Sequence, residues 1–114
     1  MSPAKAIAST QVRDAAPLFA ALGDETRLRL ITRLSSGGPG SIARLSRKSR
    51  VSRQAITKHL EVLSAAGLVR SSRRGRERIW QLDPKRLTDA HEYLDRISRQ
   101  WDNALERLKS FVER

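Results

Sequence analysis

The pattern of hydrophobic and polar positions predicts an amphipathic helix over residues 52–66. Its apolar residues recur at spacings of four and three, and they are Ile56, Leu60 and Leu63. This spacing places them on one face of a helix with 3.6 residues per turn. Ser52 can cap the start of the helix, because its hydroxyl can accept a hydrogen bond from an unpaired backbone N–H. Gly67 can end it in the left-handed conformation.

The opposite face and the cap of this helix carry polar side chains that suit DNA, namely Ser52, Arg53, Gln54, Thr57 and Lys58. Arginine and glutamine can each form two hydrogen bonds to a purine, and a threonine methyl can contact thymine. A shorter helical run, residues 41–46, lies just upstream, and the polar stretch 47–50 separates the two. Two helices joined in this way are typical of a helix-turn-helix. An ordinary solvated helix face is the alternative interpretation.

Two further helices are predicted before this motif. The first should begin around Asp14, because Pro17 fits only within a first helical turn, where its missing N–H does no harm. Asp24 caps the second helix, residues 25–35. The expected core stripe of that second helix consists of Leu28, Ile31 and Leu34.

A β-hairpin is predicted over residues 68–82, with Gly75 in its turn. The side chains expected on its inward face are Val69, Trp80 and Leu82. Its tip carries three arginines, which are Arg73, Arg74 and Arg76. Crowded like charges are unfavourable in isolation, but they are favourable beside a phosphate backbone or in a narrow minor groove. A hairpin that directly follows a helix-turn-helix is a wing.

A long helix is predicted from residue 84 to the C-terminus. Its apolar residues alternate at spacings of three and four, and we call them the heptad seam: Leu87, Ala90, Leu94, Ile97, Trp101, Ala104, Leu108 and Phe111. Such a repeat is typical of helices that pack against one another. Since the helix overhangs so small a domain, we expect much of the seam to meet a second copy of the chain. The alternative is that it packs on the chain's own first two helices.

These elements give a mainly α fold with a small β-hairpin (α+β), a winged helix-turn-helix with a long C-terminal dimerisation helix. The expected organisation is a mobile N-terminal arm at 1–12, a winged helix-turn-helix DNA-binding domain at 13–83 and a dimerisation helix at 84–114.

The net charge of +11 is concentrated in one third of the chain. Residues 41–78 contain eleven basic and two acidic residues, and this clustering is expected of a protein that binds a polyphosphate. There is no cysteine, nucleophile–base pair or phosphate-binding glycine loop, so neither an enzyme nor a cofactor is expected. The segment 1–10 does not resemble a secretory signal, and the longest apolar stretch, 15–22, is too short to span a bilayer. A cytoplasmic protein without membrane contact is expected.

The chain resembles the ArsR-type winged-helix family of bacterial transcriptional regulators. The resemblance covers residues 18–112 and is strongest in FAALGDETR at 19–27, in VSRQAITKHLEVLSAAGLV at 51–69 and in RGR at 74–76. It implies a homodimer built from the first and last helices, with two recognition helices in successive major grooves and repression by promoter occupancy. The residues expected at the dimer interface are Leu18, Phe19, Leu94, Ile97, Trp101, Leu105 and Leu108.

The family's metal sites are incomplete in this sequence. One of them uses a Cys-x-Cys run on the first helix of the motif, and residues 41–46 contain no cysteine. The other opens with Asp-x-His, as Asp89 and His91 do here, but Asp102 and Leu105 stand where its later ligands would be. Since Zn²⁺ needs four ligands, or three and a water, we expect no metal. His91 is expected at the surface, and His59 as a hydrogen-bonded structural residue.

The sequence therefore predicts a homodimeric repressor that binds double-stranded DNA at a (pseudo)palindromic operator and is nucleoid-associated when bound. It identifies no small-molecule inducer. The alternatives are a non-specific architectural or RNA-binding basic protein, a metal-responsive sensor of the same fold, and an interaction module whose long helix recruits another protein.

Overall fold

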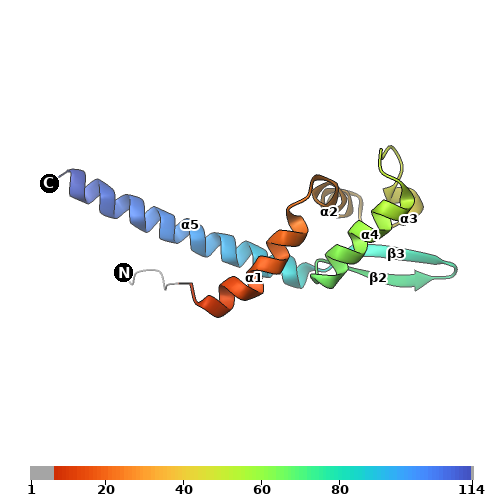
Figure 1. Ribbon diagram of the computed structural model, residues 1–114, viewed down its shortest axis with the longest axis horizontal. Helices are drawn as coiled ribbons and strands as arrows, with labels where there is room; N and C mark the ends of the chain where they lie inside the picture. Colours follow the sequence, from red (N-terminus) through yellow and green to blue (C-terminus); the bar gives the residue numbers. More distant parts are fainter. Residues whose placement is uncertain (1–6, 114) are drawn as a thin grey trace.

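The computed structural model describes residues 7–113, which form five helices and a three-stranded antiparallel sheet. In chain order the elements are α1 (Ser9–Leu22), α2 (Glu25–Gly37), β1 (Gly40–Ser41), α3 (Ile42–Leu45), α4 (Arg53–Ala65), β2 (Val69–Arg74), β3 (Glu77–Leu82) and α5 (Pro84–Val112). The molecule measures 67 × 26 × 20 Å, because α5 projects from one end and the β2–β3 hairpin from the other (Figure 1). The predicted fold, a winged helix-turn-helix with a long C-terminal helix, is confirmed.

A single apolar core holds α1, α2, α4, the sheet and the start of α5 together. The predicted inner face of α4 is buried completely, since Ile56, Leu60 and Leu63 are each at most 1% exposed. Trp80 and Val69 are also buried, and Leu82 is half-buried against the core. The inward face predicted for the hairpin is therefore confirmed. Burial of each such side chain contributes about 1.5–3 kcal/mol relative to its exposure to water.

The predicted cap of α4 is also confirmed. The Ser52 hydroxyl accepts a hydrogen bond from the backbone N–H of Ala55 at 3.2 Å. At the other end, Gly67 has a φ of +77°, and a Cβ there would lie 2.8 Å from the Arg86 side chain. Both ends of α4 are thus fixed by local interactions.

Replacing Ser52 with alanine should lower the free energy of unfolding by about 1 kcal/mol, because the first turn of α4 loses the acceptor for an N–H group. Urea unfolding followed by circular dichroism measures this loss. Ser64→Ala, at an exposed position on the same helix, is the control and should change the free energy by less than about 0.5 kcal/mol. Equal losses in the two variants would show that Ser52 does not cap the helix.

The sheet contains a third strand that the sequence analysis missed. β1 pairs with β3, with Gly40 opposite Trp80, so the strand order is β1-β3-β2. A two-residue strand cannot show an alternating pattern, and this one follows a segment rich in glycine and proline. The hydroxyl of Ser41 then caps α3 by accepting from the N–H of Arg44 at 3.2 Å. As a result α3 is shorter than the predicted run of residues 41–46.

The prediction for the first helix was wrong at its start. α1 begins at Ser9, so it includes residues 9–12 that were assigned to the mobile arm, while residues 1–6 of that arm lie outside the described residues. Pro17 consequently stands inside the helix, where it cannot donate a backbone hydrogen bond. Burial of one side of α1 offsets this loss, since the core of the protein includes three buried residues of the helix, namely Ala15, Leu18 and Ala21. The Gln11 side chain also stabilises the first turn by accepting from the N–H of Ala8 at 2.8 Å.

The second helix was predicted in nearly the right place but with a partly wrong inner face. α2 extends two residues beyond the predicted end, and Asp24 caps it as expected by accepting from the N–H of Arg27. Leu28 is 50% exposed, whereas Leu30 and Leu34 are buried. The four-residue step from Leu30 to Leu34, with half-buried Ile31 between them, defines the face that contacts the core.

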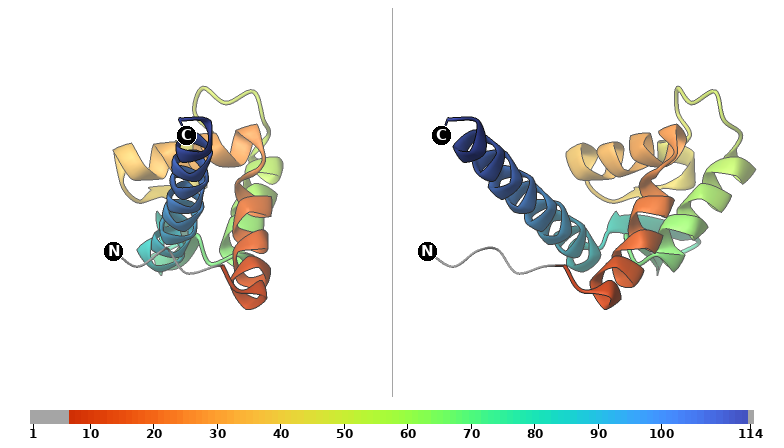
Figure 2. Two further views of the ribbon diagram at one scale, coloured as in Figure 1. Left: turned by 90° about the vertical axis from the view of Figure 1, so that its left-hand side faces the viewer. Right: turned by 60° about the vertical axis from the view of Figure 1, so that its left-hand side comes forward.

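The heptad seam divides into two parts along α5. At the start of the helix Leu87 and Ala90 pack against the chain's own core, and the Phe19 and Tyr93 rings lie 5.7 Å apart. Beyond residue 93 the large apolar side chains are exposed by 41–72%, and we call them the exposed seam: Leu94, Ile97, Trp101, Leu108 and Phe111 of the heptad seam, with Leu105 and Val112 beside them. Ala104 of the heptad seam is half-buried. In Figure 2 this part of α5 extends away from the other elements. No helix within residues 7–113 is long and apolar enough to cross a membrane.

Candidate nucleic-acid interface

The outer face of α4 presents the polar side chains that were predicted to read DNA. Ser52, Arg53, Gln54 and Lys58 are exposed, and Thr57 is half-buried. The hydroxyl of Thr57 donates to the carbonyl oxygen of Arg53 at 2.9 Å, so its donor hydrogen is already used within the helix. Its oxygen can still accept a hydrogen bond, and a threonine methyl can contact a thymine methyl. Arg53 and Gln54 lie in the first turn of α4, and recognition helices contact base edges with their N-terminal residues.

The wing forms the second basic surface. The turn between β2 and β3 is closed by Gly75 with a φ of +63°. The arginines predicted at its tip, Arg73, Arg74 and Arg76, are all exposed. Arg73 stands opposite Arg78 in the strand pairing, and the Arg78 guanidinium lies 5.7 Å from the centre of the Trp80 ring. The contact of Arg78 with the buried indole of Trp80 thus stabilises β3 next to the highly charged tip of the wing.

The structure brings the two basic surfaces to the same end of the molecule. α4 lies alongside the hairpin, and the tip of the wing lies at the end opposite the C-terminus of α5 (Figure 1). Leu60 and Leu63 of α4 belong to the same buried core as Val69 and Trp80 of the hairpin, and this shared core fixes the arrangement. A nucleic acid that contacts both surfaces would therefore leave the exposed seam of α5 free.

Three residues connect α4 to the α1–α2 junction, namely Arg27, His59 and Asp24, and of these only Arg27 was not assigned a structural role from the sequence. The Arg27 guanidinium donates to the Ala21 carbonyl at 2.5 Å and to Nδ1 of His59 at 3.2 Å. Because a guanidinium can only donate, Nδ1 is the acceptor in that contact. The carboxylate of Asp24 lies 3.8 Å from the same nitrogen. His59 is therefore a hydrogen-bonded structural residue, as predicted.

The local environment of Asp24 stabilises its charged form. The backbone N–H of Arg27 donates to the carboxylate at 3.0 Å, and this hydrogen bond lowers the pKa of Asp24 below its ordinary value. The positive charge of Arg27 acts in the same direction. Hydrogen bonds and nearby cations both favour a carboxylate over its protonated form. The cap of α2 is consequently ionised at neutral pH and helps to place Arg27 beside α4.

Two arginines of the basic segment and its neighbourhood have structural contacts. Arg44 donates to the carbonyl oxygens of Gly37 at 2.8 Å and Pro39 at 3.1 Å, which satisfies the C-terminal end of α2. Arg33 donates to the carbonyl oxygen of Leu45 at the end of α3. The basic charge around the helix-turn-helix therefore also holds α2 and α3 together.

Of the residues predicted at the dimer interface, Leu18 is buried within its own chain. It is 1% exposed and belongs to the chain's own core, so it presents no surface to a partner. Phe19 is half-buried and packs against Tyr93. The members of the predicted set that lie on α5 are all exposed, by 41–63%: Leu94, Ile97, Trp101, Leu105 and Leu108.

The partial Asp-x-His pattern on α5 does not bring ligands together. Asp89 accepts from the Arg86 guanidinium at 2.8 Å, and His91 is exposed. Within residues 7–113 there is no group of three or more histidine, cysteine, aspartate or glutamate side chains that could hold a metal ion. The surface position predicted for His91 is confirmed.

Comparisons with known proteins agree with this geometry. Residues 22–72 match a helix-turn-helix domain family. The chain is 41% identical over 85 residues to the HTH-type transcriptional regulator Rv2034 of Mycobacterium tuberculosis, an alignment that covers 75% of this chain and 76% of that protein. An ArsR-like transcriptional regulator from Rhodococcus sp. RHA1 superimposes with a TM-score of 0.77 at 38% identity, over 90% of this chain and 95% of that one.

A more distant structure shares the fold. It is the homodimeric winged helix-turn-helix DNA-binding domain of Mb0332 from Mycobacterium bovis, a possible ArsR-family regulator. Its TM-score is 0.63 at 18% identity, over 87% of this chain and 88% of that one. From its fold and its relatives, the chain belongs to the ArsR-type family of winged helix-turn-helix transcriptional regulators.

Proposed function

We propose that the protein is a homodimeric repressor that binds a twofold-symmetric operator in double-stranded DNA. The outer face of α4 carries this proposal, because it exposes Arg53, Gln54 and Lys58 on a helix whose other face is completely buried. Arg53 and Gln54 would contact bases in the major groove, while Ser52, Thr57 and Lys58 would complete the contact surface. The protein would act in the cytoplasm, on the nucleoid when bound to DNA.

Dimerisation would occur through α5. The exposed seam extends over residues 94–112 of α5 and mostly follows the heptad spacing, and an apolar stripe of that length is unfavourable in water. Pairing of two such seams would cover them and relate the two recognition helices by a twofold axis. A dimer of this kind reads two half-sites about 34–36 Å apart, one turn of the duplex. Binding there would repress transcription by occupying the promoter.

Selection of bound sequences from random DNA duplexes tests sequence specificity. A twofold-symmetric consensus is the expected result, and protection of the same sites in a footprint would give the half-site spacing. Failure to recover a consensus would instead favour a non-specific architectural or RNA-binding protein. Sedimentation of the DNA-free protein tests the dimer, and a monomer at all concentrations would contradict the proposal.

The wing should contribute affinity without specificity. Replacing Arg74 with alanine should weaken binding to every duplex by a similar factor, about 3- to 10-fold, because its exposed guanidinium would contact phosphate and not bases. The slope of log K against log salt should fall in magnitude by about one. Fluorescence anisotropy at several salt concentrations, on selected and scrambled duplexes, measures both quantities.

The control for this variant is Arg107→Ala, at an exposed position in the C-terminal part of α5, and that end of the helix lies opposite the wing (Figure 1). It removes the same charge and should leave the salt slope unchanged. A loss confined to the selected duplex in Arg74→Ala would show that the wing reads bases.

A further inference from the structure

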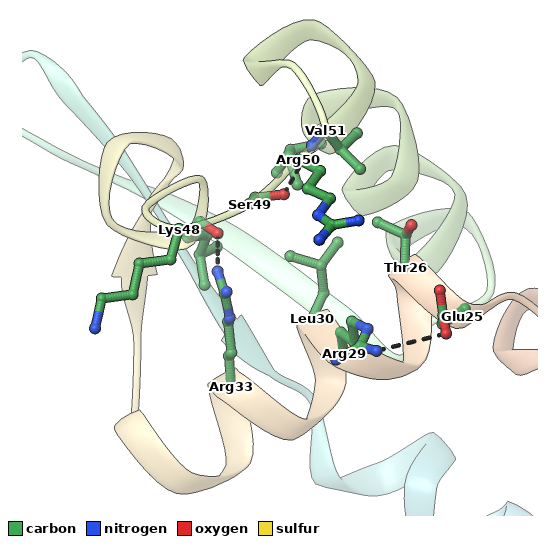
Figure 3. A pocket seen from close by; sticks show the side chains of 11 residues that line it. Glu25, Thr26, Arg29, Leu30, Arg33, Lys48, Ser49, Arg50 and Val51 are labelled. Atoms are coloured by element: carbon green, nitrogen blue, oxygen red, sulfur yellow. Dashed lines mark hydrogen bonds and ion pairs between the residues drawn. The ribbon is translucent and has the colours of Figure 1, made fainter.

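A cavity of about 530 Å³ lies between α2 and the segment that joins α3 to α4 (Figure 3). α2 provides one wall, and residues 48–51 of the joining segment provide the other. From α4 only Ile56 lines the cavity, and it belongs to the buried face of that helix. The cavity is therefore separate from the outer face of α4 and from the wing. Its volume is in the range of about 300–1,000 Å³ that is usual for small-molecule sites.

The walls of this cavity are strongly cationic. Four basic residues line it, namely Arg29, Arg33, Lys48 and Arg50. The lining contains one acid, Glu25, whose carboxylate lies 3.4 Å from the Arg29 guanidinium. Both of these side chains are more than 70% exposed, so their ion pair contributes little and can be exchanged for another partner.

Arg50 is a cation that is available to a ligand. Among residues 7–113 its side chain has no hydrogen bond or ion pair, and its guanidinium extends over Leu30, toward α2 (Figure 3). Arg33, in contrast, already donates to the carbonyl of Leu45. In the same view Lys48 lies on the side of Arg33 that faces away from Arg50. Like charges crowded in this way repel one another, and a bound anion would relieve the repulsion.

The floor of the cavity is apolar. Leu30, Leu45 and Ile56 line it and are each at most 3% exposed, and half-buried Val51 lies at the rim. An inorganic anion would gain nothing from these side chains. A ligand that joins an anionic group to a small apolar body could use both the cations and the floor, as small-molecule sites commonly do.

We propose that this cavity is a binding site for an organic anion, whose carboxylate or phosphate group is held by Arg29 and Arg50. Guanidinium groups are suited to this task because each can donate two parallel hydrogen bonds to such a group. The apolar body of the ligand lies against Leu30 and Ile56.

The ligand site is coupled to the DNA-binding helix through the chain itself. Residues 48–51 lead directly into Ser52, the cap of α4, and Lys48 has a φ of +61°, which is uncommon for a residue other than glycine. A ligand that bridges α2 and this segment would place negative charge beside the first turn of α4. The bound ligand would therefore lower the affinity for DNA, an effect that rests on the proposed function.

The test is a titration of the full-length, DNA-free protein with phenyl phosphate, followed by ¹H–¹⁵N NMR of the backbone amides and the arginine Nε–H groups. Saturable shifts are expected for residues 26–33 and 48–51 and for the side chains of Arg29 and Arg50. Inorganic phosphate should bind the same residues more weakly, and phenol should not bind. The double variant Arg29→Ala, Arg50→Ala should lose at least about tenfold in affinity for phenyl phosphate, because two charged hydrogen-bond donors are removed.

Arg107→Ala is the matched control, since it removes an exposed arginine of α5 and should bind phenyl phosphate like the wild type. An equal loss in this control would show a general effect of net charge and overturn the proposal. Shifts confined to the wing or to the outer face of α4, or no saturable shift at millimolar phenyl phosphate, would also overturn it. If the double variant loses DNA affinity while phenyl phosphate causes no shift, the two arginines serve the DNA backbone and the ligand site is refuted.

DNA affinity measured with and without phenyl phosphate, at constant ionic strength, tests the coupling. A loss of affinity is expected in the wild type and not in the double variant. If the protein binds phenyl phosphate but its affinity for DNA does not change, the coupling is refuted and the proposed binding site still stands. A protein that does not bind DNA at all would refute the proposed function, while the direct titration would still report on the cavity.

Discussion

Replacing Leu94 and Ile97 with aspartate should convert the protein to a monomer and lower its affinity for the selected operator by about 10²- to 10⁴-fold. Both side chains lie on the exposed seam, where they are 52% and 41% exposed in the single chain. Four aspartates would face one another in a dimer that pairs these seams, and their burial would require unpaired charges to leave water. Each protomer would then bind one half-site alone and lose the contribution of its partner.

The fold of each chain should survive this change, because the core is formed without either residue. Analytical ultracentrifugation measures the association state, and circular dichroism at the same concentration measures helix content. The control variant carries aspartate at Asn103 and Ser110, two positions of α5 outside the heptad seam, and so adds the same charge. It should remain dimeric. A wild-type protein that is already monomeric, and that exposes the seam to another protein, would instead indicate an interaction module.

The elements that sequence alone predicted well are those with long, regular patterns. The inner face of α4 and the heptad seam each repeat an apolar spacing over several helical turns, so a single period is sufficient to identify them. The wing was predicted because two short runs flank a Gly-centred turn. The candidate DNA-binding residues follow from the same patterns, since they are simply the polar positions opposite a buried face.

The features that were missed depend on tertiary contacts. Pro17 lies inside α1 because burial of that helix offsets a lost hydrogen bond, which no local rule anticipates. Leu28 and Leu30 are both leucines, and only the position of α2 on the core decides which of them is buried. Leu18 was assigned to the dimer interface, although an apolar residue on a helix can serve the chain's own core equally well.

The arginine-lined cavity was also beyond sequence analysis. Its walls come from two segments about twenty residues apart, and the charge of each segment alone resembles an ordinary solvated surface. The contact between Arg27 and His59 joins residues that are 32 positions apart in the chain. In both cases the packing of α2 against α4 brings the residues together. The sequence shows that these residues are present but not that they lie close in space.

The second large effect is expected from the two residues proposed to read bases. Replacing Arg53 or Gln54 with alanine should lower affinity for the selected operator by about 1–3 kcal/mol and relax the preference at the contacted base pair. Both side chains are exposed and neither takes part in the core, so the free energy of unfolding should stay within about 0.5 kcal/mol of the wild type. Affinity for a scrambled duplex should fall much less, because binding there depends on phosphate contacts.

Competition binding on the selected operator, on operators changed at single base pairs and on a scrambled duplex measures these differences. Glu61→Ala is the control on the same helix, at an exposed position two turns further from its N-terminus, and should leave the base preference unchanged. The decisive quantity is the ratio of specific to non-specific affinity, since a general loss of charge lowers both by the same factor. If Arg53→Ala leaves that ratio unchanged, Arg53 contacts the backbone, and the specificity of the protein arises from other residues or from the shape of the DNA.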